Sequence, residues 1–235
     1  MVLVTAAAGG GGHFAIQFAK RMGAAKVIAT VGSDKKAAAV ASLCCADRII
    51  NYKKEDVNEV LKSECPFGID VAFEGVGGRM FISALNNMSH NGKLLVAGYI
   101  SEYPHTMNTK QRDKITKTHT LLEKIFWNST EIDLDGMKIT GQLWPKLADE
   151  RAAIRSEVFS LSENGAIFPL IDRSKSFVGL DSCVDAVEYM LSGESIGKVV
   201  VDINPDILDQ STFRESGEGD TFSRSTMSNQ PEYYI

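Results

Sequence analysis

The sequence predicts an α/β fold built on a doubly wound parallel sheet. Short apolar runs, which are typical of strands, alternate along the chain with stretches of helical periodicity. Several of these runs are apolar almost throughout, as expected for parallel strands that helices cover on both faces. Strands and helices that alternate in this way are joined by right-handed crossovers, and such crossovers build a sheet of this kind.

Each element can be placed in order along the chain. Strand-like runs of apolar and β-branched residues lie at 2–6, 26–31, 48–52, 70–75, 93–100, 137–144, 166–172 and 197–203. Helical patterns lie at 12–22, from Asp34 with Ser33 as its N-cap, and at 54–63, 79–89, 113–127, 145–164 and 180–193. The polar segment 101–136 interrupts the alternation.

A glycine-rich turn follows the first predicted strand. Gly9, Gly10, Gly11 and Gly12 stand directly before the first helix, and Ala6 precedes them. A helix N-terminus attracts phosphate through its free N–H groups and its partial positive charge, and glycine lets the phosphate approach the backbone. The spacing departs from G-x-G-x-x-G, and a flexible loop is the alternative. The strand before the turn and the βα units after it favour the dinucleotide site of a Rossmann fold.

The end of the second predicted strand indicates which dinucleotide binds. In an NAD site an acidic residue there holds the ribose 2′-hydroxyl, but residues 30–32 include no acid. Ser33, Lys35 and Lys36 follow, and a hydroxyl with a lysine suits a 2′-phosphate. A solvated first helical turn is the alternative, and it is weakened because lysine there opposes the helix dipole. We therefore favour NADP(H) over NAD(H).

Composition and charge exclude several classes of protein. The net charge of −5 and the absence of a long basic block argue against nucleic acid. No apolar run reaches the roughly 18 residues that a membrane-spanning helix needs, so we expect no membrane partner. Cys44, Cys45, Cys65 and Cys183 form no C-x-x-C pair. We expect reduced thiols, no bound metal, and an intracellular protein, cytoplasmic by default with a peroxisome or mitochondrion left open.

Five stretches of the chain resemble a known family. They are VLVTAAAGGGGHFAIQFAK, SDKKAAAVASL, DRIINYKKEDVNEVLK, GIDVAFEGVGGRMF and NGKLLVAGYIS. They resemble the medium-chain dehydrogenase/reductase superfamily, in its zinc-free quinone oxidoreductase branch. The resemblance is dense over residues 2–101, thins over 102–170 and returns at GLDSCVDAVEYMLSGESIGKVVVDI.

The resemblance implies a set of residues around NADP(H). The glycine turn would hold the pyrophosphate, and Ser33, Lys36 and Tyr52 would meet the 2′-phosphate. Gly11 stands where relatives usually have Thr or Val. The remaining residues that would line the cofactor follow later strands and are Gly75, Val76, Ala97, Gly98, Tyr99, Ile100, Ser101, Tyr103, Gln142, Leu143, Trp144 and Ser195.

The resemblance also implies an activity. It is the NADPH-dependent reduction of the carbon–carbon double bond of α,β-unsaturated ketones, such as 15-oxoprostaglandins, or the reduction of quinones. The partner would be a small enone or quinone, and a homodimer is left open. No catalytic residue can be named, because Tyr99 and Tyr103 fit a role in packing the cofactor better. The sequence has no Y-x-x-x-K, which argues against a short-chain dehydrogenase.

The resemblance further suggests three parts to the chain. Residues 1–174 would form the Rossmann NADP-binding domain. Residues 175–204 would help to complete a GroES-like catalytic domain that, in the family, precedes the glycine turn. The polar residues 205–235 have the composition of a disordered tail. On this layout we expect the chain to be a fragment. A non-catalytic NADP-binding fragment or an interaction module is the alternative to a reductase.

Overall fold

A seven-stranded sheet lies at the centre of the molecule. The computed structural model describes residues 1–103, 117–128, 131–141 and 148–203. The strand order is β3-β2-β1-β4-β5-β7-β6, and every neighbouring pair is parallel except β6 with β7. The strands are β1 (Val2–Val4), β2 (Val27–Val31), β3 (Arg48–Asn51), β4 (Ile69–Glu74), β5 (Met88–Val96), β6 (Ile132–Leu134) and β7 (Met137–Gly141). This is the doubly wound order of a Rossmann fold, and the predicted fold class is confirmed.

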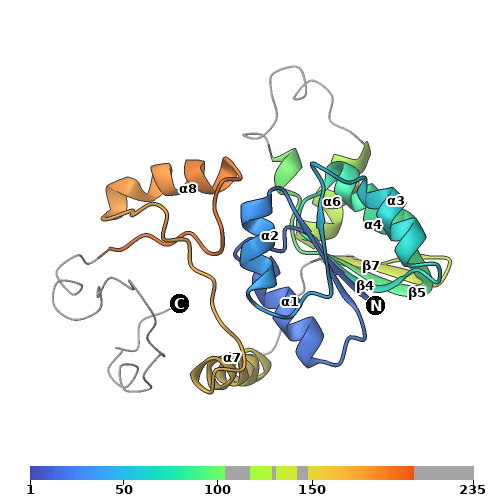
Figure 1. The fold of residues 1–235 in the computed structure, drawn as a ribbon, viewed down its shortest axis with the longest axis horizontal. Helices are drawn as coiled ribbons and strands as arrows, with labels where there is room; N and C mark the ends of the chain where they lie inside the picture. The colour runs from blue at the N-terminus through green and yellow to red at the C-terminus, as the bar shows by residue number, and fades with distance from the viewer. Residues whose placement is uncertain (104–116, 129–130, 142–147, 204–235) are drawn as a thin grey trace.

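Helices cover both faces of the sheet. The helices that do so are α1 (Gly12–Arg21), α2 (Asp34–Ala41), α3 (Val57–Glu64), α4 (Gly78–Asn86) and α6 (Lys117–Asn128). The other described elements are the helices α7 (Ala148–Glu163) and α8 (Cys183–Leu191) and the 3₁₀ turns η1 (Ile100–Glu102) and η2 (Leu180–Ser182). Because successive strand residues point to opposite faces, Leu3 packs with Leu61 of α3 and Phe81 of α4, whereas Val4 packs with Ile16 of α1. Figure 1 shows the same division of the helices between the two faces.

The helix starts differ in how their N–H groups are satisfied. At α2 the Ser33 hydroxyl accepts from the Lys36 N–H at 3.2 Å, so the predicted N-cap is confirmed. At α3 the Asp56 carboxylate accepts from the Glu59 N–H at 3.0 Å. Helix α1 starts after Gly11 with no side-chain cap and no acid in its first turn. The first turn of α1 is therefore free to meet an anion.

The C-terminal part of the described chain forms a small cluster of its own. Phe177, Ala186 and Tyr189 are buried together, with Val199 and Val201 packed against them. Figure 1 shows α8 set apart from the sheet. The strands predicted at 166–172 and 197–203 are wrong, because in the described residues these segments make only isolated bridges. An apolar β-branched run becomes a strand only where a neighbour offers it a ladder of hydrogen bonds.

One described strand was not predicted, and some predictions fall outside the residues that the structure describes. The edge strand β6 was not predicted, because its three residues, IDL, carry no apolar run. The predicted tail 205–235 and the predicted cofactor residues Gln142, Leu143 and Trp144 lie outside the described residues. Across the described ranges, no helix has both the length and the apolar character needed to cross a membrane.

Candidate functional site

The glycine turn brings the start of α1 against the end of β1. A Cβ added to Gly12 would lie 2.8 Å from Ala6 C and 2.8 Å from Ala7 Cα, and it would overlap the Ala6 carbonyl oxygen. Only glycine fits there without moving the backbone. A Cβ on Gly11 would meet only Phe73 Cζ, at an ordinary 3.7 Å. The close approach therefore depends on Gly12 and not on Gly11.

The same turn presents unused donors. Within the described residues, the N–H groups of Gly10, Gly11 and Gly12 donate to no protein acceptor. The Gly9 carbonyl is occupied, since it accepts from the His13 N–H at 3.2 Å and contacts His13 Nδ1 at 2.8 Å. Free N–H groups at the positive end of a helix form a site for a phosphate group.

The structure brings Ser33, Lys36 and Tyr52 to one corner beside this turn. Tyr52 follows β3, and its ring lies over Gly32, where an added Cβ would be 2.8 Å from Tyr52 Cζ. Ser33 is the next residue and caps α2. The Lys36 ammonium donates to the Gly193 carbonyl at 2.7 Å. The three residues predicted at the 2′-phosphate are therefore neighbours, and their role there stays a prediction.

Charge at this corner is predominantly positive. The Asp34 carboxylate is already paired, accepting from Lys54 Nζ at 2.6 Å and from Asn51 Nδ2 at 2.9 Å. These bonds lower the pKa of Asp34. Burial first, and then the neighbouring Lys53, lowers the pKa of Lys36. Asp172 partly opposes this lowering. A phosphate placed here would relieve the repulsion that Lys36 feels from Lys53, and the nearby Asp34 already has partners.

The loop after β4 is held by two side chains at the sheet edge. The Thr5 hydroxyl accepts from the Gly75 N–H at 2.9 Å. The Glu74 carboxylate accepts from the N–H of Val76 at 2.9 Å and from that of Gly77 at 3.0 Å. Three consecutive N–H groups before α4 are thus occupied by the protein itself. An anion is therefore directed to the start of α1 and not to that of α4.

The loop after β5 is tied to the loop after β4. The Ser101 hydroxyl and N–H donate to the Val76 carbonyl, at 2.7 and 2.9 Å. Glu102 in η1 accepts from the Gly78 N–H at 2.9 Å. Two segments that the sequence analysis assigned to the cofactor therefore form one rigid edge. The residues involved in that assignment are Gly75, Val76, Ala97, Gly98, Tyr99, Ile100, Ser101 and Tyr103.

Glu74 is completely buried, which sets its protonation apart from an ordinary glutamate. Burial is the main cause that raises its pKa, to about 7. The hydrogen bonds from Val76, Gly77 and Thr5 oppose this rise, and the nearby Glu102 carboxylate adds to it. The buried carboxyl therefore titrates near neutral pH at the edge of the candidate site.

Tyr99 and Tyr103 pack together in an aromatic cluster. Tyr99 is buried, with its ring centroid 4.9 Å from that of Tyr103 and 5.6 Å from that of Phe126 in edge-on contacts. Its hydroxyl accepts from the Trp127 indole N–H at 3.1 Å. Burial raises the pKa of Tyr103. Tyr99 is therefore held by α6, and its role toward a cofactor stays a prediction.

Sequence reasoning missed several residues of this region. Ser195, which it did name, is buried in the segment Gly193–Lys198 that crosses the glycine turn. The missed residues are Thr5, Glu74, Glu102 and Lys198. A signal existed for Glu74, because it ends a strand at the edge where the cofactor was expected. Lys198 stood three residues after Ser195, and only the fold shows what it touches.

A parallel sheet whose first strand leads through a glycine turn into an uncapped helix defines a nucleotide-binding domain of the Rossmann class. A family model described as zinc-binding dehydrogenase matches residues 10–137. The chain belongs to this family, within the medium-chain dehydrogenase/reductase superfamily, as the sequence resemblance predicted.

Named relatives and a solved structure are similar to most of the chain. Mouse (Mus musculus) prostaglandin reductase-3 is 36% identical over 86% of this chain and 52% of its own length. The NADP(+)-dependent 2-alkenal reductase of Nicotiana tabacum is 32% identical over 85% of this chain and 53% of its own. The quinone oxidoreductase of Escherichia coli, solved with NADPH, superposes with a TM-score of 0.65 at 25% identity over 86% of this chain and 56% of its own. The chain spans about half the length of the curated relatives it matches.

The family's description names zinc, and the described residues do not fit that ion. Nowhere in them do three His, Cys, Asp or Glu side chains gather as metal ligands would. Cys44, Cys45, Cys65 and Cys183 are all free thiols.

Proposed function

We propose that the chain binds NADP(H) and serves the reduction of α,β-unsaturated ketones or quinones. The glycine turn carries this proposal, because three unused N–H groups stand at the start of α1 where only glycine fits at position 12. These donors suit a pyrophosphate. The names of the relatives support the substrate class, since they describe a prostaglandin reductase, an alkenal reductase and a quinone oxidoreductase.

The preference for NADP(H) over NAD(H) rests on the corner formed by Ser33, Lys36 and Tyr52. Ser33 caps α2 and keeps its hydroxyl hydrogen for a phosphate oxygen. Lys36 supplies a positive charge. Its ammonium group donates to the Gly193 carbonyl, and it forms no ion pair with a carboxylate among the described residues. Asp34 is tied to Lys54 and Asn51, so it does not compete for a ribose hydroxyl. A 2′-phosphate fits this set better than a 2′-hydroxyl does.

The chain's own residues would act mainly by position. NADPH, when bound, supplies the hydride that reduces the double bond. The loops after β4 and β5 would hold the reactive ring, because Thr5, Glu74 and Glu102 fix their backbone. Their rigidity places the ring without reorganisation during the reaction. No catalytic acid is assigned to a residue of this chain.

Turnover with a defined substrate tests this proposal. The chain would be mixed with NADPH and either an α,β-unsaturated ketone or a quinone, and the product would be identified by mass spectrometry. A saturated ketone or a hydroquinone, formed as NADPH is oxidised, is the expected result. Binding of NADPH without any product would overturn the reductase proposal in favour of a cofactor-binding role.

The proposed division of the chain follows its packing. We propose a Rossmann domain over 1–174 and a separate segment over 175–204, because Phe177, Ala186 and Tyr189 form their own cluster. Apolar side chains stay exposed on and beside α8, and we propose that they meet a second domain or a second copy of the chain. The exposed residues are Leu180, Val184, Val187 and Met190. Free cysteines support an intracellular location, with the compartment to be decided by fractionation.

A further inference from the structure

The segment Gly193–Lys198 crosses directly over the glycine turn. The Gly197 N–H donates to the Ala8 carbonyl at 2.7 Å, and Gly9 and Gly197 form a parallel bridge. The Lys198 side chain then lies on Gly10, where an added Cβ would be 2.8 Å from Lys198 Cδ and 3.7 Å from its Nζ. The ammonium group therefore stands beside Gly10, whose N–H is one of the donors that the turn leaves unused.

The backbone of this segment is held firmly in place. The Lys198 N–H donates to the Leu170 carbonyl at 2.7 Å, and the Lys198 carbonyl accepts from the Asp172 N–H at 2.9 Å. The buried Asp172 carboxylate accepts from the Ile196 N–H at 2.7 Å and from the Tyr189 hydroxyl at 2.9 Å. The position of Lys198 beside the turn is therefore built into the fold and does not depend on a mobile side chain alone.

The charge of Lys198 has no carboxylate partner among the described residues. The charge of Lys198 acts on the first turn of α1. The pKa of His13 is lowered mainly by burial, and the positive charge of Lys198 lowers it further. Helix end and ammonium thus add positive charge at one place, and an anion there would satisfy both.

We infer that Lys198 is a positioning residue of the cofactor site and binds the pyrophosphate of the dinucleotide from the side opposite α1. The inference rests on the proposed function. It assigns the two phosphate groups of the cofactor to two lysines from different parts of the chain. Lys198 meets the pyrophosphate that NADPH and NADH share, whereas Lys36 meets the 2′-phosphate that only NADPH carries.

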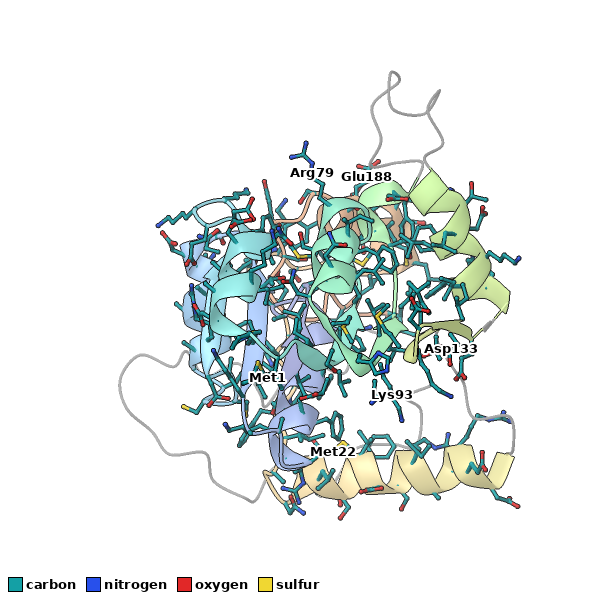
Figure 2. The ribbon with its side chains drawn as sticks, turned by 90° about the vertical axis from the view of Figure 1, so that its right-hand side faces the viewer. Met1, Met22, Arg79, Lys93, Asp133 and Glu188 are labelled. Carbon is teal, nitrogen blue, oxygen red and sulfur yellow. The ribbon has the colours of Figure 1, made fainter. Side chains whose placement is uncertain are left out.

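Two fragments of the cofactor separate these roles. ADP-ribose contains the pyrophosphate without a 2′-phosphate, and adenosine 2′-phosphate contains the reverse. Calorimetry on the 235-residue chain would compare Lys198→Met, which keeps the aliphatic stem, with Lys198→Arg. The control is Lys93→Met. Lys93 is an exposed residue of β5 and forms no ion pair among the described residues. Figure 2 shows Lys93 toward the opposite end of the sheet from Arg79, which lies at the start of α4.

Lys198→Met is expected to weaken ADP-ribose about tenfold, as loss of one charge-assisted contact would. Adenosine 2′-phosphate should bind as before, Lys198→Arg should restore most of the ADP-ribose affinity, and Lys93→Met should change neither. Unchanged ADP-ribose affinity in Lys198→Met would overturn the inference. So would an equal loss for both fragments with a lowered melting temperature, because the segment would then act as structure only. A wild-type chain that binds NADPH poorly would instead overturn the proposed function itself.

Discussion

Replacing Gly12 by alanine tests the close approach on which the glycine turn depends. The new Cβ would lie 2.8 Å from two backbone atoms of Ala6 and Ala7, closer than real Cβ contacts come. These atoms belong to the backbone, so the start of α1 must move. Such overpacking costs about 1–3 kcal/mol of stability. Gly11→Ala is the matched control, because its Cβ would meet only Phe73, at 3.7 Å.

The comparison isolates the overlap. Alanine restricts the unfolded chain in both variants, which adds about 0.4–1 kcal/mol to each where the fold accepts it. The difference in unfolding free energy between Gly11→Ala and Gly12→Ala is therefore the overlap cost, about 1–3 kcal/mol. Chemical denaturation with equal m-values would measure it. NADPH affinity should fall with Gly12→Ala, since the N–H groups move. Equal stability of the two variants would refute the reasoning.

Two more predictions concern charge and capping. The pKa of Glu74 is raised to about 7, so the folded chain keeps a proton that the unfolded chain loses near pH 4.5. The contribution of Glu74 to the free energy of unfolding therefore falls by about 3 kcal/mol as pH rises from about 4.5 to 7. Glu74→Gln should flatten the slope of unfolding free energy against pH, measured by denaturation at several pH values. An unchanged slope would contradict the burial argument. Ser33→Ala and Asp56→Ala should each cost about 1 kcal/mol of stability, because each removes an N-cap. Only Ser33→Ala should also weaken NADPH binding. Equal NADPH affinity in the two variants would show that Ser33 is not part of the cofactor site.

Much of the fold could be predicted because its signals are local. Apolar runs and helical periodicity locate β1 to β5 and the helices between them, and the glycine turn marks the start of α1. The run GKVVVDI has the composition of a strand but makes only isolated bridges. Strand formation there depends on a neighbour, which a local pattern does not report. The edge strand β6 has only three residues, too few to give a recognisable pattern.

The candidate site divides in the same way. Ser33 could be placed because it follows a strand that ends at the cofactor edge of the sheet, and Tyr52 could be placed only through the family resemblance. Lys198 could not, since it comes from the far end of the chain and reaches Gly10 only through the fold. The sequence also does not distinguish a buried carboxylate from an exposed one, so Glu74 was passed over although it holds the loop after β4.

The central claim is that the turn at α1 and the corner at α2 together bind NADP(H). Calorimetric titration of the chain with NADPH and NADH, repeated for Lys36→Met and for its neighbour Lys35→Met, tests it most directly. We predict that NADPH binds at least about tenfold more tightly than NADH, the difference that one charged contact provides. Lys36→Met should remove most of this preference, and Lys35→Met should keep it. Equal affinity of the unaltered chain for the two dinucleotides, or no binding of either, would contradict the account.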